Sequence, residues 1–207
     1  MEINKNCCVL SEDLKSFFKN SKSQYELKEY DKNTDTNIKI KIKVKHASCL
    51  FEHVDKNLQK YFASFFKSDS CADYILLNKN NDIYDIHIFE LCKTYNNKKE
   101  DLALQLEGAF LRINAILHYC KQIKINNYYF YCVSENIGAS IIDNKFMYKG
   151  KKIKDFYPEK LKLNHNSLFY TESNQELNIY ILKSDFNKNH NILEYDIDKY
   201  FYNTSLI

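Results

Sequence analysis

A long amphipathic segment, Glu100–Cys120, lies between two sets of short apolar runs and limits the folds open to this chain. Its apolar residues recur at steps of three and four, which is the spacing of one helix face: Leu102, Leu106, Ala109, Phe110, Ile113, Leu117 and Cys120. Gly108 lies inside this predicted helix, where glycine costs about 1 kcal/mol relative to alanine. We therefore expect Gly108 to permit a close approach between the helix and a sheet.

The segments around this helix have the patterns of buried strands. Asp73–Leu77 and Ile83–Leu91 are apolar runs separated by a polar turn, which predicts a hairpin. Tyr128–Val133 is a continuous apolar run, as expected for an interior strand. Leu50–Phe66 carries apolar residues at helical spacing. The predicted central order is therefore helix, strand, strand, long helix, strand.

The two ends of the chain predict further elements. Apolar spacing from Ser11 to about Tyr30 indicates a helix with Ser11 as its N-cap. Asn37–Lys45 alternates β-branched residues with lysines, so it predicts a strand with one apolar and one basic face. The basic face suits either a phosphate backbone or the solvated side of an edge strand. Beyond Gly138 we expect short strands and turns: strands at Ile141–Lys149, Ser167–Tyr170 and Leu177–Leu182, with Pro158 in a loop.

Length and composition predict a single globular domain over residues 1–207. With 44% hydrophobic and 28% charged residues, the chain can bury a core without disulfides. We divide it into an N-terminal helix and strand (1–48), a core (49–135) and a β-rich C-terminal extension (136–207). The net charge of +3 permits binding to nucleic acid without requiring it.

Cysteine usage and hydropathy predict the compartment. Seven cysteines are an odd number without a C-x-x-C pair, which fits neither a secreted disulfide framework nor a zinc ribbon. We expect them to be reduced and mostly buried. No apolar run is long enough for a membrane span or a signal peptide. These patterns predict a cytoplasmic protein that does not enter the membrane.

Motifs of several common enzyme classes do not occur in the sequence. With three glycines, it contains no Gly-rich phosphate loop, dinucleotide-binding fingerprint or G-x-S-x-G elbow. Its six histidines form no metal-ligand pair on a helix face, which disfavours a histidine-rich zinc site. The remaining candidates are two carboxylates, a lysine and an amide: Asp73, Glu90, Lys93 and Gln105.

In CADYILL, HIFELCK and DLALQLEGAFLRI the chain resembles the PD-(D/E)XK nuclease superfamily, over about residues 50–133. The resemblance implies an α/β, restriction-endonuclease-like core: a mixed central sheet flanked by helices, here with a β-rich C-terminal elaboration. It also implies hydrolysis of phosphodiester bonds, with DNA as the expected partner, in restriction or another defence against foreign DNA. The cofactor it implies is Mg²⁺ or Mn²⁺.

The same resemblance implies a role for each candidate residue. Asp73, Glu90 and the carbonyl of Leu91 would be the metal ligands, which suits a hard cation that prefers oxygen. Lys93 would orient or deprotonate the attacking water, and Gln105 would face the site from the long helix. Each residue except Glu90 also has a plain structural interpretation, as a strand-entry, strand-end or exposed helical residue. A carboxylate at Glu90, among apolar neighbours, is costly to bury without a partner or metal.

The motif departs from the superfamily in the spacing between Glu90 and Lys93. The usual spacing is two residues, which puts both side chains on one face of a strand, whereas here it is three and Cys92 takes the lysine's place. On a regular strand Lys93 points away from Glu90. A β-bulge at Leu91 or Cys92 would bring it back. The function therefore stays open between a metal-dependent nuclease and a catalytically degenerate module that binds nucleic acid or a protein.

A third interpretation is an interaction protein, such as a homodimer, whose aromatic residues form an interface. Among weaker site candidates, Glu52 is expected on the helix before Asp73. Asp101 and Arg112 share a predicted helix face with Gln105, so Arg112 could reach a phosphate or pair with an acid. Asp85 and His87 alternate onto the strand face opposite Glu90, which excludes them from its site.

Overall fold

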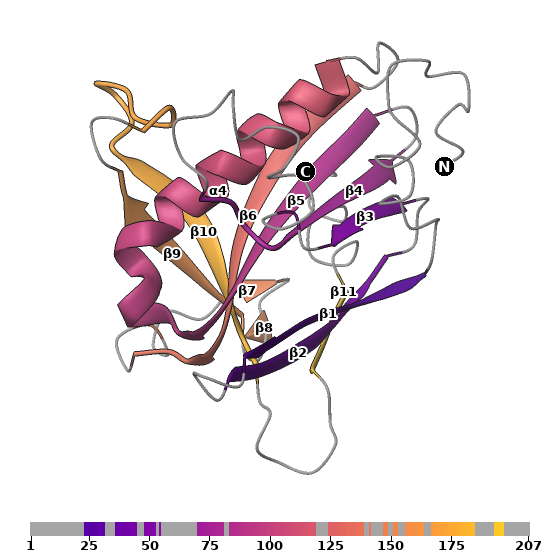
Figure 1. Cartoon of the computed structure of the whole chain (residues 1–207), viewed down its shortest axis with the longest axis vertical. Helices are drawn as coiled ribbons and strands as arrows, with labels where there is room; N and C mark the ends of the chain where they lie inside the picture. The colour runs from indigo at the N-terminus through magenta and orange to yellow at the C-terminus, as the bar shows by residue number, and fades with distance from the viewer. Residues whose placement is uncertain are drawn as a thin grey trace.

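The structure is a computed structural model of the chain. It describes residues 23–31, 36–44, 48–52, 54, 70–80, 83–118, 124–138, 141, 147–148, 151–152, 156–163, 167–184 and 193–196. Strands predominate in this part of the chain, and one long helix accompanies them (Figure 1).

A six-stranded mixed sheet is the central layer, with the order β3-β4-β5-β6-β10-β9. β3, β4 and β5 are antiparallel neighbours, β5, β6 and β10 run parallel, and β9 is antiparallel to β10. The strands are β3 (Ser48–Glu52), β4 (Tyr74–Asn80), β5 (Ile83–Thr94), β6 (Lys124–Asn136), β9 (Phe156–Lys162) and β10 (Glu176–Lys183). The mixed central sheet expected from the sequence is thus present.

The hairpin and the long helix form the middle of this sheet. β4 and β5 pair antiparallel, which confirms the predicted hairpin. Helix α4 (Tyr95–His118) follows β5 directly, beginning at Tyr95 rather than at Glu100. β6 lies parallel to β5. Parallel neighbours require a crossover connection, and α4 lies in the connection between these two strands. β6 lies between β5 and β10, so the predicted interior strand is confirmed.

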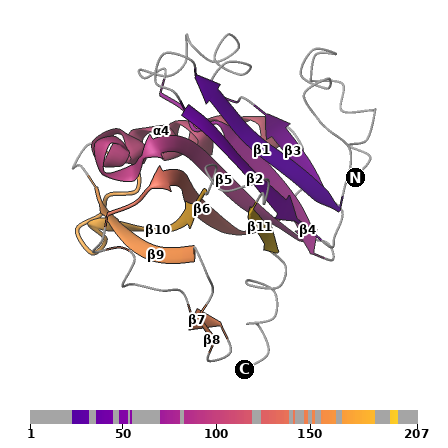
Figure 2. The same ribbon diagram turned by 90° about the horizontal axis from the view of Figure 1, so that it is seen from below.

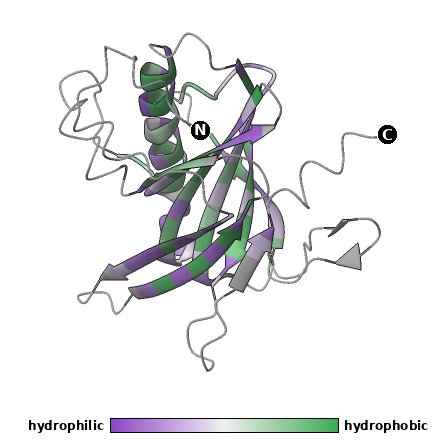
Figure 3. Cartoon of the chain, turned by 90° about the vertical axis from the view of Figure 1, so that its right-hand side faces the viewer, coloured by the Kyte–Doolittle hydropathy of each residue, from purple (hydrophilic) through white to green (hydrophobic). Residues whose placement is uncertain are grey.

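A three-stranded sheet forms a second layer, with the order β1-β2-β11. Its strands are β1 (Gln24–Asp31), β2 (Thr36–Lys43) and β11 (Leu193–Asp196). The alternating strand predicted at Asn37–Lys45 is confirmed: Ile38, Ile40, Ile42 and Val44 are buried, and polar and apolar residues alternate along both β1 and β2 (Figure 3). β2 is nevertheless the middle strand of this sheet and not an edge strand, because β11 pairs with it in parallel.

The central sheet is covered on both faces, as Figure 2 shows. On one face, Ile86 and Ile88 of β5 belong to the same apolar cluster as Leu106 and Ile113 of α4. On the other face, Phe89 and Leu91 of β5 belong to a cluster with Ile40 and Ile42 of β2. Burying one such side chain contributes roughly 1.5–3 kcal/mol. In the described residues the second face is therefore covered by strands, where the sequence had led us to expect helices.

Tyr74 also links the two layers through a polar contact. Its hydroxyl donates a hydrogen bond of 2.6 Å to the carbonyl of Lys28 in β1, and burial raises the pKa of this phenol above its ordinary value. The contact anchors β1 to the start of β4, next to Asp73.

Two helices predicted near the N-terminus are replaced in part by strands. Residues 24–30 of the helix expected over Ser11–Tyr30 form β1, whose buried residues Tyr25 and Leu27 alternate with more exposed ones; residues 11–22 lie outside the description. Of the helix expected over Leu50–Phe66, residues 50–52 belong to β3, Val54 is helical, and residues 53 and 55–66 lie outside the described part of the chain. Leu50 and Phe51 of β3 pack into the clusters on opposite faces of the central sheet, so consecutive apolar residues imitate helical spacing.

The C-terminal region is β-rich as expected, and its strands join the other sheets. The strand expected at Leu177–Leu182 is confirmed within β10. Pro158 lies in β9 and not in a loop; β9 is an edge strand, where a residue without N–H is tolerated. Ser167–Tyr170 forms turns rather than a strand. Within Ile141–Lys149, β7 (Met147–Tyr148) pairs with β8 (Lys151–Lys152).

Gly108 permits a close approach, but its neighbour is the chain segment before β4 and not the sheet. A Cβ atom at this position would overlap the carbonyl oxygen of Ser70 and lie 2.8 Å from Nη1 of Arg112. The helix can pack here only because residue 108 has no side chain. No helix in the described residues is long and apolar enough to cross a membrane.

Candidate active site

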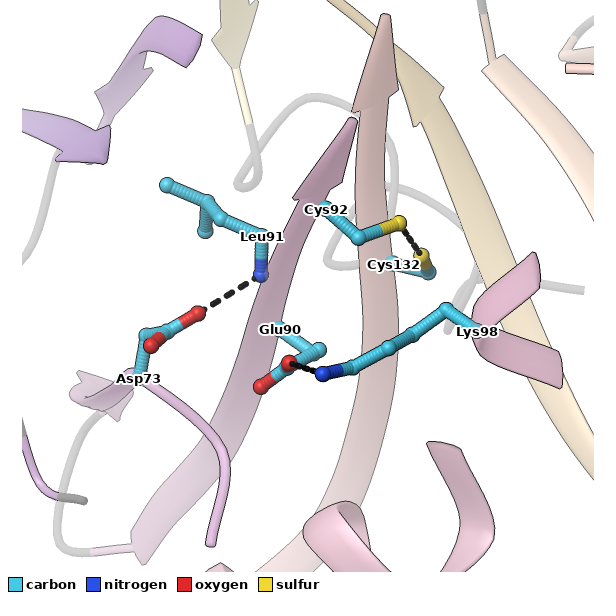
Figure 4. Close-up of polar contacts among 6 residues, drawn as sticks. All are labelled: Asp73, Glu90, Leu91, Cys92, Lys98 and Cys132. Atoms are coloured by element: carbon cyan, nitrogen blue, oxygen red, sulfur yellow. Dashed lines mark hydrogen bonds and ion pairs between the residues drawn. The ribbon is translucent and has the colours of Figure 1, made fainter. Parts of the chain in front are cut away.

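Asp73 and Glu90 are brought together at the end of the β4–β5 hairpin. Tyr74 pairs with Phe89, so the antiparallel register places Asp73 opposite Glu90. Oδ2 of Asp73 accepts a hydrogen bond of 2.8 Å from the backbone N–H of Leu91. Figure 4 shows both carboxylates in front of the same stretch of β5. The two acidic residues selected from the sequence therefore share one small region.

Glu90 is almost fully buried, with 3% of its surface exposed. Its Oε1 lies 3.2 Å from Nζ of Lys98, whereas its Oε2 is buried without a hydrogen-bond partner. Burial and the neighbouring Asp73 carboxylate hold the pKa of Glu90 well above its ordinary value, although Lys98 acts in the opposite direction. This carboxyl group has one satisfied oxygen and one oxygen available to a further ligand.

Lys98 is the cation at this site, and the sequence analysis did not select it. It lies in the first turn of α4, which folds back over the sheet and directs the side chain toward Glu90 (Figure 4). Partial burial acts to lower the pKa of Lys98, but the Glu90 and Asp73 carboxylates outweigh it and raise that pKa. One signal could have identified this residue. The first turn of α4 carries Lys98 and no acid, although the positive end of a helix favours acidic residues.

Lys93 does not reach Glu90, because β5 has no bulge where one would be needed. The pairing of β5 with β6 runs in step from Ile86 to Thr94, and its irregularity lies earlier, between Tyr84 and Ile86. Lys93 is therefore on the face of β5 opposite Glu90. The bulge considered at Leu91 or Cys92 is absent from β5. Without this bulge, the Lys93 side chain is not brought to the face of the strand that carries Glu90.

Gln105 lies beside the segment that carries Asp73. Its carbonyl accepts a hydrogen bond of 2.9 Å from the N–H of Ala72, and its side-chain Oε1 is buried without a hydrogen-bond partner. Because α4 begins at Tyr95, Gln105 lies further into the helix than the first turns. The predicted core side of the helix is confirmed: Leu106, Ala109, Ile113 and Leu117 are buried, and Phe110 packs against them.

Leu91 contributes its backbone N–H to the site, through the bond to Asp73. The metal-ligand role of its carbonyl stays a prediction. Its side chain is buried in the cluster between the two sheets, which fixes this part of β5.

Two thiols adjoin the site on the same face of the sheet. Sγ of Cys92 lies 3.4 Å from Sγ of Cys132, and both side chains are buried. The hydrogen bond from Cys132 helps to hold the pKa of Cys92 below its ordinary value, while that of Cys132 is raised. Cys49, Cys71, Cys92 and Cys132 are reduced thiols and are buried, as expected; Cys7, Cys8 and Cys120 lie outside the described residues.

The weaker candidates lie elsewhere or have structural roles. Glu52 ends strand β3, not a helix, and alternates onto the face of Leu50, away from Asp73. Asp101 is exposed on α4. Arg112 is fully buried, and its Nη1 donates hydrogen bonds to the carbonyls of Ser70 at 3.1 Å and Gly108 at 3.0 Å. A buried guanidinium tied to carbonyls does not reach a phosphate in solvent.

Asp85 and His87 lie on the face of β5 opposite Glu90, as alternation predicted. Asp85 accepts hydrogen bonds from Asn126 and from the N–H of Asn127, both at 3.0 Å. His87 is buried, stacks on Tyr129 and Tyr131, and bonds the Tyr131 hydroxyl through Nδ1 at 2.8 Å. Burial lowers the pKa of His87 to about 3, so the imidazole is neutral.

Acidic residues lie next to the lysines on the basic face of β2. Lys39 forms an ion pair of 3.1 Å with Glu26 of β1, and Lys41 and Lys43 have Glu194 and Asp196 of β11 as register neighbours. Glu26 thus offsets the charge of Lys39, and Asp196 is the register neighbour of Lys43. This arrangement fits the solvated-face interpretation.

The site combines the carboxyl groups of Asp73 and Glu90 with the ammonium group of Lys98, and the backbone of Gln105 lies beside the segment that carries Asp73. In the described part of the chain, no group of three or more His, Cys, Asp and Glu side chains is arranged to hold a metal ion. A site of two carboxylates completed by backbone and solvent oxygens does not need such a group. No family model, curated protein or solved structure matches this chain. The interpretation of the site therefore depends on its geometry and on the short resemblance in sequence.

Proposed function

We propose that this chain is a metal-dependent nuclease of the restriction-endonuclease-like kind, which hydrolyses phosphodiester bonds in DNA. The observation that carries the proposal is the state of Glu90. Its carboxyl group lies beside Asp73, gives one oxygen to Lys98 and buries the other without a hydrogen-bond partner. Such an oxygen costs free energy unless a ligand occupies it.

A divalent cation fits the donors at this site. Asp73 and Glu90 are two acidic groups close together; burial and the Asp73 carboxylate raise the pKa of Glu90, and Lys98 opposes this shift. Mg²⁺ and Mn²⁺ prefer oxygen ligands, so Asp73, Glu90 and the Leu91 carbonyl would hold the ion. When bound, it supplies Lewis-acid polarisation of the phosphate.

The residues of the chain then have separate tasks. Lys98, and not Lys93, supplies the ammonium group that orients a water molecule and stabilises negative charge developing on the phosphate. The Leu91 N–H fixes the Asp73 carboxylate, and the Glu90 carboxylate fixes the Lys98 side chain. Gln105 offers a buried amide oxygen that can accept a hydrogen bond from a water molecule or ligand at the same end of the site.

The nature of the substrate follows from the resemblance in sequence. DNA is the expected substrate, and restriction or another defence against foreign DNA is the expected setting. The ion pair of Lys39 with Glu26 lowers the positive charge of the β1-β2-β11 sheet, so we do not propose this sheet as the binding surface. A homodimer would supply a second active site for cleavage of the opposite strand.

Cleavage and metal binding test the proposal together. Supercoiled plasmid and single-stranded DNA are incubated with the protein and Mg²⁺ or Mn²⁺, with chelator as a control, and Mn²⁺ binding is followed by calorimetry. We expect cleavage that requires the metal. A protein that neither cuts DNA nor binds Mn²⁺ would contradict the proposal.

The second candidate is a catalytically degenerate module that binds nucleic acid or a protein. It is favoured by one observation, the position of Lys93 on the wrong face of β5. Binding of DNA that is independent of metal, without cleavage, is the result expected of it. Substitution of Lys98 distinguishes the two candidate functions. The nuclease requires the positive charge of Lys98 for cleavage, whereas the degenerate module does not need this charge.

A further inference from the structure

The pair formed by Cys92 and Cys132 is not used by the proposed reaction. The two residues lie on neighbouring parallel strands, where Glu90 pairs with Cys132 and Cys92 pairs with Ser134. The thiols are therefore diagonal neighbours on one face of the sheet, and their sulfur atoms are 3.4 Å apart. Figure 4 shows them next to the Glu90–Lys98 ion pair.

We propose that Cys92 and Cys132 form a site of reversible oxidation, at which a small hydroperoxide converts the two thiols into a disulfide. The sulfur atoms already face one another, and a disulfide bond of about 2.05 Å requires them to approach further by little more than 1 Å. Side-chain rotation supplies part of this movement. The inference is independent of the proposed nuclease activity.

The two cysteines differ in access, which sets their order of reaction. Cys92 is 7% exposed and Cys132 is 0% exposed, so the oxidant meets Cys92 first. With hydrogen peroxide, the Cys92 thiolate attacks one oxygen and the O–O bond breaks, giving a sulfenic acid and, with one proton, one water. The Cys132 thiol then attacks the Cys92 sulfur, forms the S–S bond and releases a second water. Two thiols lose two electrons in total, and the peroxide gains them.

The diagonal position makes this disulfide easy to reduce. Diagonal neighbours on adjacent strands are further apart than directly opposed residues, so their bond strains the backbone. Strained disulfides have higher reduction potentials and are the labile ones. We therefore expect millimolar reduced glutathione to restore both thiols in the folded protein.

Peptide mapping of the oxidised, folded protein tests the proposal. Full-length protein is treated with hydrogen peroxide, blocked with a thiol reagent and digested without reduction, and the cross-linked peptides are identified by mass spectrometry. We expect a Cys92–Cys132 peptide 2 Da lighter than the two thiols, because two hydrogens are lost. Cys49, 3% exposed, is the internal control: burial raises its pKa to about 12. It should react at least about ten-fold more slowly than Cys92.

Single substitutions separate the two roles. In Cys132→Ser the sulfenic acid on Cys92 should persist and be trapped by dimedone, whereas Cys92→Ser should leave Cys132 unoxidised. A variant with Cys7, Cys8 and Cys120 replaced by serine removes competing thiols, and mapping of the wild type gives the same answer if that variant does not fold. Two results would overturn the proposal. One is Cys92 remaining a thiol under peroxide that oxidises the unfolded chain, and the other is a disulfide from Cys92 to a different cysteine.

Discussion

Nζ of Lys98 lies 3.2 Å from Oε1 of Glu90, across the gap between the first turn of α4 and strand β5. Lys93, which follows Glu90 closely in sequence, lies on the other face of the strand. The lysine that contacts Glu90 in the fold is thus Lys98, and not Lys93, the lysine that the sequence motif indicates.

Lys98→Met should lower kcat for metal-dependent DNA cleavage by at least about 100-fold, because removal of one charge that stabilises a transition state has effects of this size. Lys93→Met is the matched control and should change kcat by less than about three-fold, the scale of surface substitutions. Cleavage rates under saturating Mg²⁺ measure both. The reverse outcome, with Lys93 essential and Lys98 dispensable, would reject the assignment.

Asp73→Asn and Glu90→Gln should each abolish measurable Mn²⁺ binding, because amides are much poorer ligands than carboxylates for this ion. Asp73→Asn retains an oxygen for the Leu91 N–H, so its circular dichroism spectrum should match the wild type. Calorimetric titration with Mn²⁺ gives the result. Glu52→Gln is the control, since Glu52 lies on the other face of the sheet. Unchanged Mn²⁺ affinity in both site variants would place the metal elsewhere.

His87 should make the protein less stable in acid. The pKa of the His87 imidazole is about 3 in the folded protein and 6.5 without burial, as in the unfolded chain. As the pH falls below 6.5, the unfolded chain therefore binds a proton at His87 and the folded protein does not. The stabilisation is fully present above pH 6.5 and is lost progressively down to about pH 3, to a total of a few kcal/mol.

Urea unfolding between pH 7 and pH 4 measures this loss. His87→Phe keeps a ring to stack between Tyr129 and Tyr131 and should give a flatter pH dependence. Leu104→Ala, at an exposed position of α4, removes no titratable group and should leave the wild-type slope unchanged. An identical slope in His87→Phe would show that another group controls acid stability.

Gly108→Ala should lower the free energy of unfolding by about 2 kcal/mol or more, because the added Cβ overlaps the Ser70 carbonyl and displaces the segment before β4. An ordinary glycine inside a helix would give the opposite sign, since alanine is the better helix former. Urea denaturation distinguishes the two. Leu104→Ala, at a position 45% exposed on the same helix, is the control and should change stability by less than about 1 kcal/mol.

Much of the central layer could be predicted because its patterns are local. The pairing of β4 with β5, the core side of α4 and the apolar run of β6 each depend on residues that are close in sequence. The same is true of the opposition between Asp73 and Glu90, which follows from a hairpin and its register. Strand β3 was misassigned because a strand buried between two layers has apolar residues on both faces, and these imitate helical spacing. In β1 only the short alternation of Tyr25 and Leu27 marks the strand, and both residues also fitted the apolar spacing that begins at Ser11.

Lys98 could not be placed from the sequence, because its contact depends on how α4 folds back over β5. Glu90 lies in β5 and Lys98 in α4, so the end of a strand and the start of a helix separate them. Neither the two-residue repeat of a strand nor the 3.6-residue repeat of a helix relates the directions of the two side chains. The covering of the second sheet face was missed for a similar reason. It depends on pairing between β2 and β11, at opposite ends of the chain.

The pairing of β11 with β2 also determines when the protein can finish folding. Leu193 pairs with Ile40, so the sheet of β1, β2 and β11 is incomplete until residue 193 and those after it in β11 have been synthesised. Contacts between residues so distant in sequence make folding slow. During synthesis β2 remains an open edge beside a hydrophobic face, which is the condition that promotes aggregation. The lysines that alternate along β2 therefore protect the nascent chain at the stage before β11 emerges from the ribosome.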